Sequence, residues 1–584
     1  CRDENGCYRI TGRLKDMIIR GGENIYPKEI EEFIYTHPAV KDVQVIGVPD
    51  RKYGEEAMAC IILKEPGSVT EDEMFAYIKA SLARHKVPKY IRFTDAFPMN
   101  AAGKILKYKM REDATRELGL DEETILKKLS GSKAASVTLA RQLSREDADR
   151  LRAIRQNGNS PDAEVLIGIT FDEDASRWYP MGTLLAQTLG LCNVDGEGQS
   201  GLELQYNDVL AGKPGKMITE VDARARTLPD GVTLYVPAEQ GNTLRLTIDR
   251  DVQAAVERAV RECAQVNDAV SVQAIAMDVN TGALLAMAMY PTYDPANPPR
   301  DDLDRLNELM RLTVLSDVYE PGSTFKMLTV LEYMKENPNT WQDYVYNCNG
   351  SYQNGDYTIK CYHGTAHGAQ NLIQAFANSC NGAFAEIGMQ INSEKFRALA
   401  NQMLFNSELP YTLPYNQSTF SLDGSSDDWE KLQTAIGQGK TQITPLHNLM
   451  IVSAIANGGT LMKPYMIDHV ENVGGQTVKK FLPSAYGTLM SANDAQFLTH
   501  LMSQVVEIGT GSAMRGASYT VAGKTGSAEF EAGKETHSWF VGFAPADKPK
   551  VAICVLAEES GSGGAVAAPI ARQVLDRYFA KYGQ

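Results

Sequence analysis

Ser323 and Lys326 are the pair of residues in this sequence best suited to nucleophilic chemistry. Pro321 and Gly322 break the structure before them, and apolar residues then recur at positions 325, 328, 331 and 334. This helical spacing predicts a helix that starts near Ser323, with Lys326 one turn further along the same face. Burial and the positive end of a helix both lower the pKa of a lysine, and a neutral amine can remove a serine proton. Ser323 is therefore a candidate nucleophile, and Lys326 is its candidate base.

The Ser-x-x-Lys pattern alone is weak, because about two matches are expected by chance in a chain of this length. Ser130 and Lys133 also fit the pattern. They lie in a small, polar segment with no apolar face that could bury the lysine, so we interpret them as solvated. Taken alone, Ser323 would be interpreted as the N-cap of a helix.

A second segment offers a hydroxyl and a carboxamide two residues apart, at Ser379 and Asn381. It lies between two helix-like stretches. Ser491 and Asn493 have the same spacing but lead directly into an amphipathic run, which is typical of a helix cap. We therefore favour Ser379 and Asn381 as site residues.

A third segment, Lys-Thr-Gly-Ser, spans Lys524, Thr525, Gly526 and Ser527 and is expected to end a strand. Lys-Thr-Gly should occur only about 0.15 times by chance in such a chain. Lys524 offers positive charge, and Thr525 and Ser527 offer hydroxyls. Gly526 allows a substrate backbone to approach the strand edge, so this segment is a candidate binding edge.

The three segments, in this order, resemble the signature of penicillin-binding proteins and serine β-lactamases. Ser379 and Lys524 follow Ser323 by 56 and 201 residues. The resemblance covers about 450 residues, because other segments also look like class B penicillin-binding proteins of the cell-division and sporulation type; these are residues 246–249, 277–291, 436–439, 444–445, 509–511 and 539–543. Cys380 stands where many β-lactamases have Asp, which favours a transpeptidase.

The resemblance implies a peptidoglycan D,D-transpeptidase that works through a serine acyl-enzyme. Lys326 would activate Ser323, Ser379 would relay a proton to the departing D-Ala, and Asn381 would orient Lys326 and the substrate amide. Lys524, Thr525 and Ser527 would bind the terminal carboxylate, and the backbone amides of Ser323 and Ser527 would form the oxyanion hole. The implied partners are stem peptides, β-lactams and cell-wall proteins of division or sporulation, with no metal or organic cofactor required.

Two alternatives from other classes stay open at this point. A β-lactamase would share all three segments but needs a base for deacylation, and the sequence does not identify one. A non-catalytic β-lactam sensor or a scaffold of the division machinery would bind penicillin without joining stem peptides.

Residues 1–128 form a separate, small α/β module in this interpretation. Strands are expected at 43–48 and 57–63, and a helix at 71–83 that Thr70 introduces. The segments at 12–16, 21–31 and 98–104 resemble the C-terminal subdomain of adenylate-forming acyl-CoA synthetases and ligases. In that family the residue matching Lys104 reaches the acyl phosphate, and the residue matching Lys15 is the hinge. The large core of that family is not found here, so we expect no adenylation activity.

Small, polar segments and changes in apolar periodicity indicate the rest of the domain organisation. We expect a linker at 129–136, a partial pedestal or dimerisation-like region at 137–236 and a transpeptidase domain at 240–584. Within them we expect helices at 139–157, 179–189 and 252–263, strands at 165–171 and 244–249, and a hairpin of 273–278 with 283–289. The predicted fold class is multidomain α+β, with an antiparallel sheet packed between helices in the last domain.

Composition limits the remaining possibilities. The chain has 584 residues and a net charge of −15. Residues 1–132 hold 22 basic and 22 acidic residues against 36 and 51 in the rest, which suggests a gene fusion or an assembly chimera with the first module as passenger. An acidic second half argues against nucleic-acid binding. We find no membrane span or signal peptide, although the resemblance implies work at the extracytoplasmic face of the bacterial membrane.

Cysteine usage leaves one local question open. Cys348 and Cys361 lie in a Gly/Asn-rich stretch and fit a disulfide, two free thiols, or a zinc site completed by His363 and His367.

Overall fold

A computed structural model divides the chain into two compact units, Cys1–Asp172 and Glu173–Gln584. The described residues are 18–20, 23–50, 54–83, 86–94, 96–99, 107, 110, 145–156, 171, 177–193, 195–220, 233–300, 302–531 and 533–583. Lys15, Lys104, the Ser130/Lys133 pair and the predicted linker at 129–136 lie outside them. The predicted domain boundaries therefore stay predictions. Among the helices that are described, none is both long enough and apolar enough to cross a bilayer.

The first unit contains a five-stranded sheet, against which two of its described helices pack. Its strands run in the order β2-β1-β4-β3, and β5 pairs in parallel with β4; the bounds are β1 Ile18–Arg20, β2 Glu23–Ile25, β3 Val40–Asp50, β4 Gly54–Leu63 and β5 Tyr90–Phe93. Helices α1 (Pro27–Ile34) and α2 (Glu71–Ser81) bury Ile30, Ile34, Met74 and Ile78 in the core. Thr70 caps α2 through a reciprocal capping box with Glu73. The predicted strands and helix are confirmed.

The segment between the first module and the large sheet contains only short elements among its described residues. They are α5 Arg145–Gln156, α6 Ala186–Leu189, α7 Gly201–Gln205, α8 Asn207–Leu210, β6 Lys216–Thr219 and β7 Thr233–Val236. The helix expected at 179–189 is wrong over most of its length. Residues 180–185 form turns, and Leu185 adopts a left-handed φ of 60°, which prevents a continuous helix before Ala186. Most of the strand expected at 165–171 lies outside the described residues.

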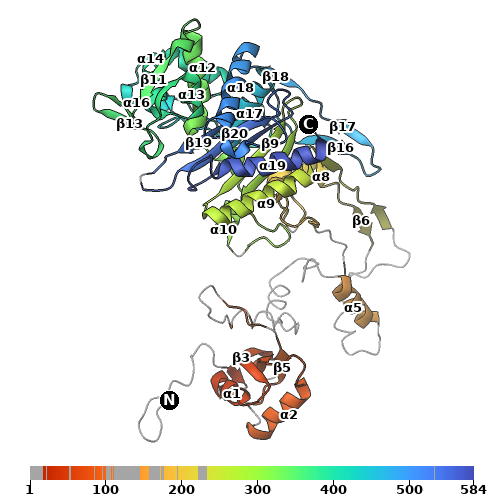
Figure 1. Cartoon of the computed structure of the whole chain (residues 1–584). Helices are drawn as coiled ribbons and strands as arrows, with labels where there is room; N and C mark the ends of the chain where they lie inside the picture. The colour runs from red at the N-terminus through yellow and green to blue at the C-terminus, as the bar shows by residue number, and fades with distance from the viewer. Residues whose placement is uncertain are drawn as a thin grey trace, which may run out of the picture. The chain divides into compact units, whose positions relative to one another are not determined.

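A five-stranded antiparallel sheet organises the second unit (Figure 1). Its order is β10-β9-β21-β20-β19, with bounds β10 Leu284–Tyr290, β9 Val272–Asp278, β21 Val551–Ala557, β20 His537–Ala544 and β19 Ala522–Ala528. The expected hairpin is β9 with β10. Because side chains alternate between the faces of a strand, Ile275 and Met277 enter one core, while Ala274 and Ala276 enter the other.

Helices cover both faces of this sheet. On one face, α9 (Arg250–Asn267) and α19 (Ala567–Tyr582) lie side by side, as Figure 1 shows. The opposite face packs against α17 (Pro445–Ala456), whose residues from Pro445 to Ile455 are all buried. The predicted α+β fold with a sheet between helices is confirmed, and the predicted helix at 252–263 is the middle of α9.

The other elements of the second unit form small sheets and the helices around the candidate site. The helices are α10 Leu303–Leu309, α11 Thr313–Ser316, α12 Lys326–Glu336, α13 Leu372–Ala377, α14 Asn381–Gln390, α15 Ser393–Gln402, α16 Asp428–Ala435 and α18 Ala492–Glu507. The strands pair as β11 Val345–Cys348 with β14 Gly368–Asn371, β12 Ser351–Asn354 with β13 Tyr357–Lys360, β15 Thr460–Met462 with β18 Ala485–Thr488, and β16 Ile467–Glu471 with both β8 Thr243–Leu246 and β17 Thr477–Lys480. Ser491 caps α18, as its sequence context predicts.

Candidate active site

Ser323 lies in a tight 3-10 turn, η2 (Gly322–Phe325), rather than in the first turn of an α-helix. The α-helix α12 begins only at Lys326, so the predicted start near Ser323 is wrong by one short turn. Gly322 has φ +52° and donates its N–H to the carbonyl of Gly437 at 2.8 Å, which fixes the entry to the turn. Ser323 keeps 9% exposure, and its hydroxyl makes no hydrogen bond with a described residue. The hydroxyl is therefore free to meet a substrate.

Lys326 is fully buried and its side chain turns toward the Ser379–Asn381 segment. Its Nζ donates to the carbonyl oxygen of Ser379 at 2.8 Å and to Oδ1 of Asn381 at 2.6 Å, and it lies 3.4 Å from Oγ of Ser379. The ammonium also lies over the ring of Phe384. Burial lowers the pKa of Lys326 to about 8, although the nearby Cys380 and Cys361 thiols oppose the shift. This amine can lose its proton near neutral pH.

The loop between α13 and α14 carries Ser379 and Asn381 toward both lysines. Ser379 has a left-handed φ of 56°, which is unusual for a residue with a side chain. Asn381 is the first residue of α14, and its Nδ2 donates to the carbonyl of Lys360 at 2.9 Å. Both ends of the Asn381 amide are thus held, and its carbonyl oxygen is aimed at Lys326.

Lys524 projects from β19, the edge strand of the large sheet. It is fully buried, and its Nζ donates to Oγ of Ser379 at 2.9 Å and to the carbonyl of Thr525 at 2.7 Å. Burial, followed by the charge of Lys326, holds its pKa well below the ordinary lysine value. Both lysines therefore converge on one hydroxyl, that of Ser379, from segments 198 residues apart.

Strand β19 also lies directly against the turn that carries Ser323. A Cβ added to Gly322 would come within 3.0 Å of Cβ of Ala528 and 3.2 Å of the Ser527 carbonyl. A Cβ added to Gly526 would come within 3.2 Å of Cγ2 of Thr324. Gly322 and Gly526 are needed at these positions because the strand and the turn approach so closely.

The other residues of the third segment also lie at this edge. The Thr525 hydroxyl lies 2.5 Å from that of Thr510, and the Ser527 hydroxyl accepts a hydrogen bond from the N–H of Gly563 at 3.3 Å. Lys524–Gly526 lies in the middle of β19, not at its end as the sequence suggested. Thr510 belongs to residues 509–511, one of the segments that resemble class B penicillin-binding proteins. Only the fold reveals that its hydroxyl bonds to that of Thr525.

Four side chains of metal-ligating type meet beside the Ser379–Asn381 loop. They are Cys348, Cys361, Cys380 and His367, and their ligand atoms all lie within 4.8 Å of one another. The sulfurs of Cys348 and Cys361 are 3.6 Å apart, far longer than the ~2.05 Å of a covalent bond, so the disulfide that the spacing allowed is not formed. The sequence pointed to three of these residues and missed Cys380; His363, the other histidine it suggested, is exposed.

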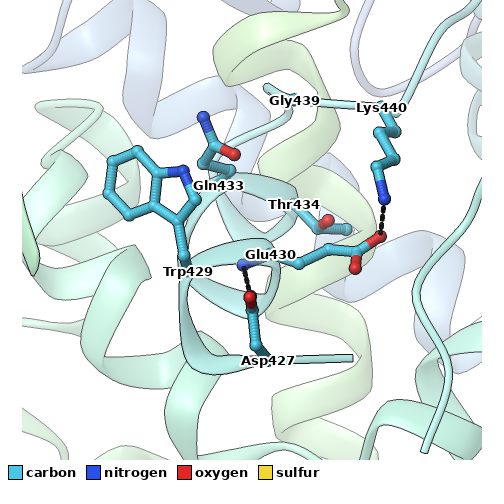
Figure 2. Close-up of a pocket in the computed structure, with 7 residues that line it drawn as sticks. All are labelled: Asp427, Trp429, Glu430, Gln433, Thr434, Gly439 and Lys440. Carbon is cyan, nitrogen blue, oxygen red and sulfur yellow. Dashed lines mark hydrogen bonds and ion pairs between the residues drawn. The ribbon is translucent and has the colours of Figure 1, made fainter. Parts of the chain in front are cut away.

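A separate pocket lies beside helix α16, and Figure 2 shows its lining. Trp429 forms one wall of this pocket. Nζ of Lys440 lies 3.5 Å from Oε1 of Glu430, and this ion pair forms another wall. None of the residues that the sequence identified as site residues lines it; the lining consists of Asp427, Trp429, Glu430, Gln433, Thr434, Gly439 and Lys440. Ser323 and the two lysines lie elsewhere.

Three family models match parts of the chain. Residues 272–576 match the model of the penicillin-binding protein transpeptidase domain. Residues 86–246 match that of the penicillin-binding protein dimerisation domain, and residues 29–104 match that of the AMP-binding enzyme C-terminal domain.

Curated relatives fall into two groups. The chain is 31% identical over 475 residues to stage V sporulation protein D of Bacillus subtilis, covering 78% of the chain and 71% of that protein. It is 29% identical over 451 residues to the peptidoglycan D,D-transpeptidase PbpA of Mycolicibacterium smegmatis, covering 72% and 88%. Its first residues match the mitochondrial medium-chain acyl-CoA ligase of Danio rerio, with 51% identity over 118 residues; these are only 20% of that ligase.

Solved structures agree with the first group. The D,D-transpeptidase domain of a peptidoglycan glycosyltransferase from Eggerthella lenta superposes with a TM-score of 0.59 and 28% identity, over 70% of this chain and 93% of that one. Penicillin-binding protein A from M. tuberculosis, solved as an imipenem acyl-enzyme, gives a TM-score of 0.59 and 25% identity over 69% and 92%.

Proposed function

The chain belongs to the penicillin-binding protein transpeptidase family, and we propose that its second unit cross-links peptidoglycan stem peptides through an acyl-enzyme on Ser323. One observation carries this proposal: Lys326 and Lys524 both reach the hydroxyl of Ser379, at 3.4 and 2.9 Å. The two lysines thus meet at Ser379, and the turn that carries Ser323 lies against β19, the strand that carries Lys524.

The first step is acylation. The neutral amine of Lys326 takes the proton of Ser323, and the Ser323 oxygen attacks the carbonyl carbon of the penultimate D-Ala. Lys326 and Ser323 are not hydrogen-bonded to each other before substrate binds, since the Lys326 amine points to Ser379 and Asn381. A catalytic hydrogen bond that is long in the free enzyme commonly tightens in the complex.

The second step releases D-Ala. Ser379, which contacts both lysines, passes a proton to the departing amine, so that the C–N bond breaks and the acyl group stays on Ser323. The amine of a neighbouring stem peptide then attacks the ester, frees Ser323 and completes the cross-link. The chemistry needs no metal ion or organic cofactor at the reacting atoms.

Binding of the terminal carboxylate falls to β19. Lys524 supplies the charge, and the hydroxyls of Thr525 and Ser527 supply hydrogen bonds. The backbone amides of Ser323 and Ser527 form the oxyanion hole, where losing one donor costs about 3 to 4 kcal/mol of transition-state stabilisation. The close approach of Gly322 to β19 brings the turn that carries Ser323 next to Ser527, which supports this assignment.

The test is covalent labelling of the full chain by a fluorescent penicillin. We expect one label per chain, located on Ser323 by peptide mass mapping, and none in Ser323→Ala. The control is Ser491→Ala, which changes a serine in a similar Ser-x-Asn pattern that caps α18. Labelling that survives in Ser323→Ala would refute the proposal.

Two further assays separate the alternatives. A thioester analogue of the stem peptide should be transferred to an acceptor amine, whereas a sensor or scaffold would be labelled without any transfer. Nitrocefin should give one stoichiometric burst, while a β-lactamase would turn it over continuously.

We propose that residues 1–128 have no adenylation activity in this chain. The ligase relative is matched over only about a fifth of its length, and residues 29–104, which include Lys104, match the C-terminal domain of AMP-binding enzymes. ATP–pyrophosphate exchange with medium-chain fatty acids should stay at the level of a Lys104→Ala variant. A Lys104-dependent exchange would show that the first unit is active.

The proposed function also predicts where the second unit acts and what it binds. We place the second unit at the extracytoplasmic face of the bacterial membrane, because its stem-peptide substrate is there. Its ligands are stem peptides and β-lactams, and its protein partners are cell-wall proteins of division or sporulation.

A further inference from the structure

We propose that Glu558 is a positioning residue for acylation, because its carboxylate, bonded to the hydroxyl of Tyr319, links the turn of Ser323 to the loop that supports Ser527 on β19. The inference rests on the proposed function, since it concerns the two backbone amides assigned to the oxyanion hole. Glu558 directly follows β21 and begins the loop of residues 558–564. Its described side-chain partners lie outside the three signature segments, so it would act through other residues.

The carboxylate of Glu558 is the centre of a small hydrogen-bond network. Its Oε1 accepts a hydrogen bond from the hydroxyl of Tyr319 at 2.7 Å, lies 3.4 Å from Nε2 of Gln273 and also accepts from the hydroxyl of Ser271. Nε2 of Gln273 further donates to the Tyr319 hydroxyl at 2.7 Å. These three donor residues are buried. A hydrogen bond to a carboxylate is roughly twice as strong as one between neutral groups, so this network can hold Tyr319 in one position.

Tyr319 precedes the nucleophile Ser323 by four residues, and the segment between them has little freedom. The main chain of Tyr319 bonds to that of Ile443 in both directions, at 3.0 and 2.8 Å. The carbonyl of Glu320 accepts a hydrogen bond from the indole Nε1 of Trp539 at 3.1 Å, and the Tyr319 ring packs edge-on against the same indole. A displacement of the Tyr319 side chain would therefore be passed on to the turn of Ser323.

The loop that Glu558 begins lies against the strand that carries Ser527. The N–H of Gly563 donates to the Ser527 hydroxyl at 3.3 Å. A Cβ added to Gly563 would come within 2.4 Å of the Gly526 carbonyl oxygen, so the loop backbone touches that of β19. The loop thus supports β19 at the residue whose amide is assigned to the oxyanion hole.

The loop between Glu558 and Gly563 is itself held in one conformation. The carbonyl of Gly561 accepts hydrogen bonds from the hydroxyls of Thr536 and Ser538, both at 2.7 Å. The N–H of Gly561 donates to the carbonyl of Thr536 at 3.1 Å. Because the loop is braced in this way, a displacement at Glu558 would reach Gly563 and the strand beneath it.

Glu558 is the point at which the two routes meet. One route leads through Tyr319 to the amide of Ser323, and the other leads through the loop to the amide of Ser527. The separation of these amides decides how well they hold an oxyanion, and a misplacement of about 1 Å can cost about 100-fold in rate. Since the oxyanion forms only in the transition state, losing the link should slow acylation without weakening the binding that precedes it.

The experiment measures the limiting rate of acylation of the full chain by a fluorescent penicillin, and the penicillin concentration that gives half this rate. We expect Tyr319→Phe and Glu558→Ala to lower the limiting rate by about 10- to 100-fold and to change the half-saturating concentration by less than about two-fold. Glu558→Gln keeps an acceptor for the Tyr319 hydroxyl and should recover most of the rate. The double variant Tyr319→Phe/Glu558→Ala should be no slower than the slower single variant, because both changes remove the same hydrogen bond.

Tyr519→Phe is the matched control. The side chain of Tyr519 is 6% exposed and that of Tyr319 is 7% exposed, and each hydroxyl donates to a carboxylate at 2.7 Å, in Tyr519 that of Asp576. Tyr519, however, belongs to the core on the other face of the sheet. Its substitution should lower the melting temperature about as much as Tyr319→Phe does, while the limiting rate stays within about two-fold of that of the unmodified chain.

Hydrogen–deuterium exchange makes a second readout that does not depend on acylation. In Tyr319→Phe the amides of residues 558–564 should exchange faster, although that segment is unchanged, and in Glu558→Ala those of residues 319–323 should exchange faster. Tyr519→Phe should alter neither segment. If penicillin did not label the unmodified chain, the proposed function would fail, and the exchange measurements would still decide whether Glu558 links the two segments.

Three outcomes would overturn the proposal. The first is a limiting rate in Tyr319→Phe equal to that of the unmodified chain. The second is an equal slowing of acylation in Tyr519→Phe. The third is faster exchange that is confined to the segment carrying the substitution.

Discussion

The pH dependence of acylation tests the role given to Lys326 most directly. The side chain is fully buried, and burial lowers its pKa to about 8. If its neutral amine is the base, the acylation rate follows the neutral fraction. That fraction is about 1% at pH 6, about 10% at pH 7 and about 50% at pH 8 for a group with this pKa. The rate should therefore rise roughly fifty-fold from pH 6 to pH 8 and less than about two-fold above it.

The assay is single-turnover labelling by a fluorescent penicillin at constant ionic strength and at saturating concentration. Saturation matters because the limiting rate reports the enzyme–penicillin complex, in which the bound carboxylate keeps Lys524 charged. The second-order constant at low concentration reports the free enzyme instead. There Lys524, whose pKa is held low by burial and by Lys326, loses its charge as the pH rises. This constant should therefore fall at high pH while the limiting rate does not.

Two results would refute this reasoning. One is a limiting rate that is flat between pH 6 and pH 8, and the other is an inflection near the ordinary lysine value of 10.5. Lys326→Arg is the matched variant, because a guanidinium keeps the charge but cannot lose a proton in this range. It should abolish acylation at every pH, and restored labelling at high pH in this variant would also contradict the assignment.

Three further predictions concern the stability of the second unit. Gly322→Ala should destabilise the second unit by about 1 to 3 kcal/mol, because the residue has φ +52° and its Cβ would press on Ala528; an unchanged melting temperature would contradict this. Phe325→Ala should cost about 3 to 5 kcal/mol, since the ring packs against three other phenylalanines in the core, and urea unfolding should detect it unless the cavity collapses fully. Ser491→Ala should cost about 1 kcal/mol by removing the cap of α18, with penicillin labelling unchanged; slowed labelling would place Ser491 closer to the chemistry than the structure does.

The candidate residues could be predicted from the sequence because the residues that identify each motif lie close together in the chain. Ser323 with Lys326, and Ser379 with Asn381, are recognisable by spacing, and the β9–β10 hairpin is recognisable by its apolar strands. The capping boxes at Thr70 and Ser491 are similarly local signals. Each of these patterns depends on residues within about one or two turns of each other, so local propensity is enough.

What the sequence could not predict depends on distant contacts. The helix expected at 179–189 fails because Leu185 is held in a left-handed conformation, with its N–H donating to the carboxylate of Glu257 at 2.6 Å. Lys524 lies in mid-strand because β19 pairs with β20 along its whole length. Cys380 joins the cysteine cluster only because α14 begins beside β11 and β13. No spacing rule within one segment contains this information.

The shared hydroxyl of Ser379 explains how one site can use two lysines for opposite purposes. Their nitrogens lie 3.4 and 2.9 Å from the same oxygen, so they are about 6 Å or less apart, and two charges at that distance repel by about 3 kcal/mol at an effective dielectric constant of 20. In the buried site without substrate, keeping both ammonium groups charged costs this repulsion free energy, so at most one of the two lysines is charged. A substrate carboxylate at Lys524 stabilises the charge there and offsets its repulsion of Lys326, so the Lys326 pKa stays at about 8 and its amine can lose its proton. Binding of the carboxylate thus assigns the two roles, because the group that recognises the substrate also decides which amine stays charged and which is free to accept the proton of Ser323.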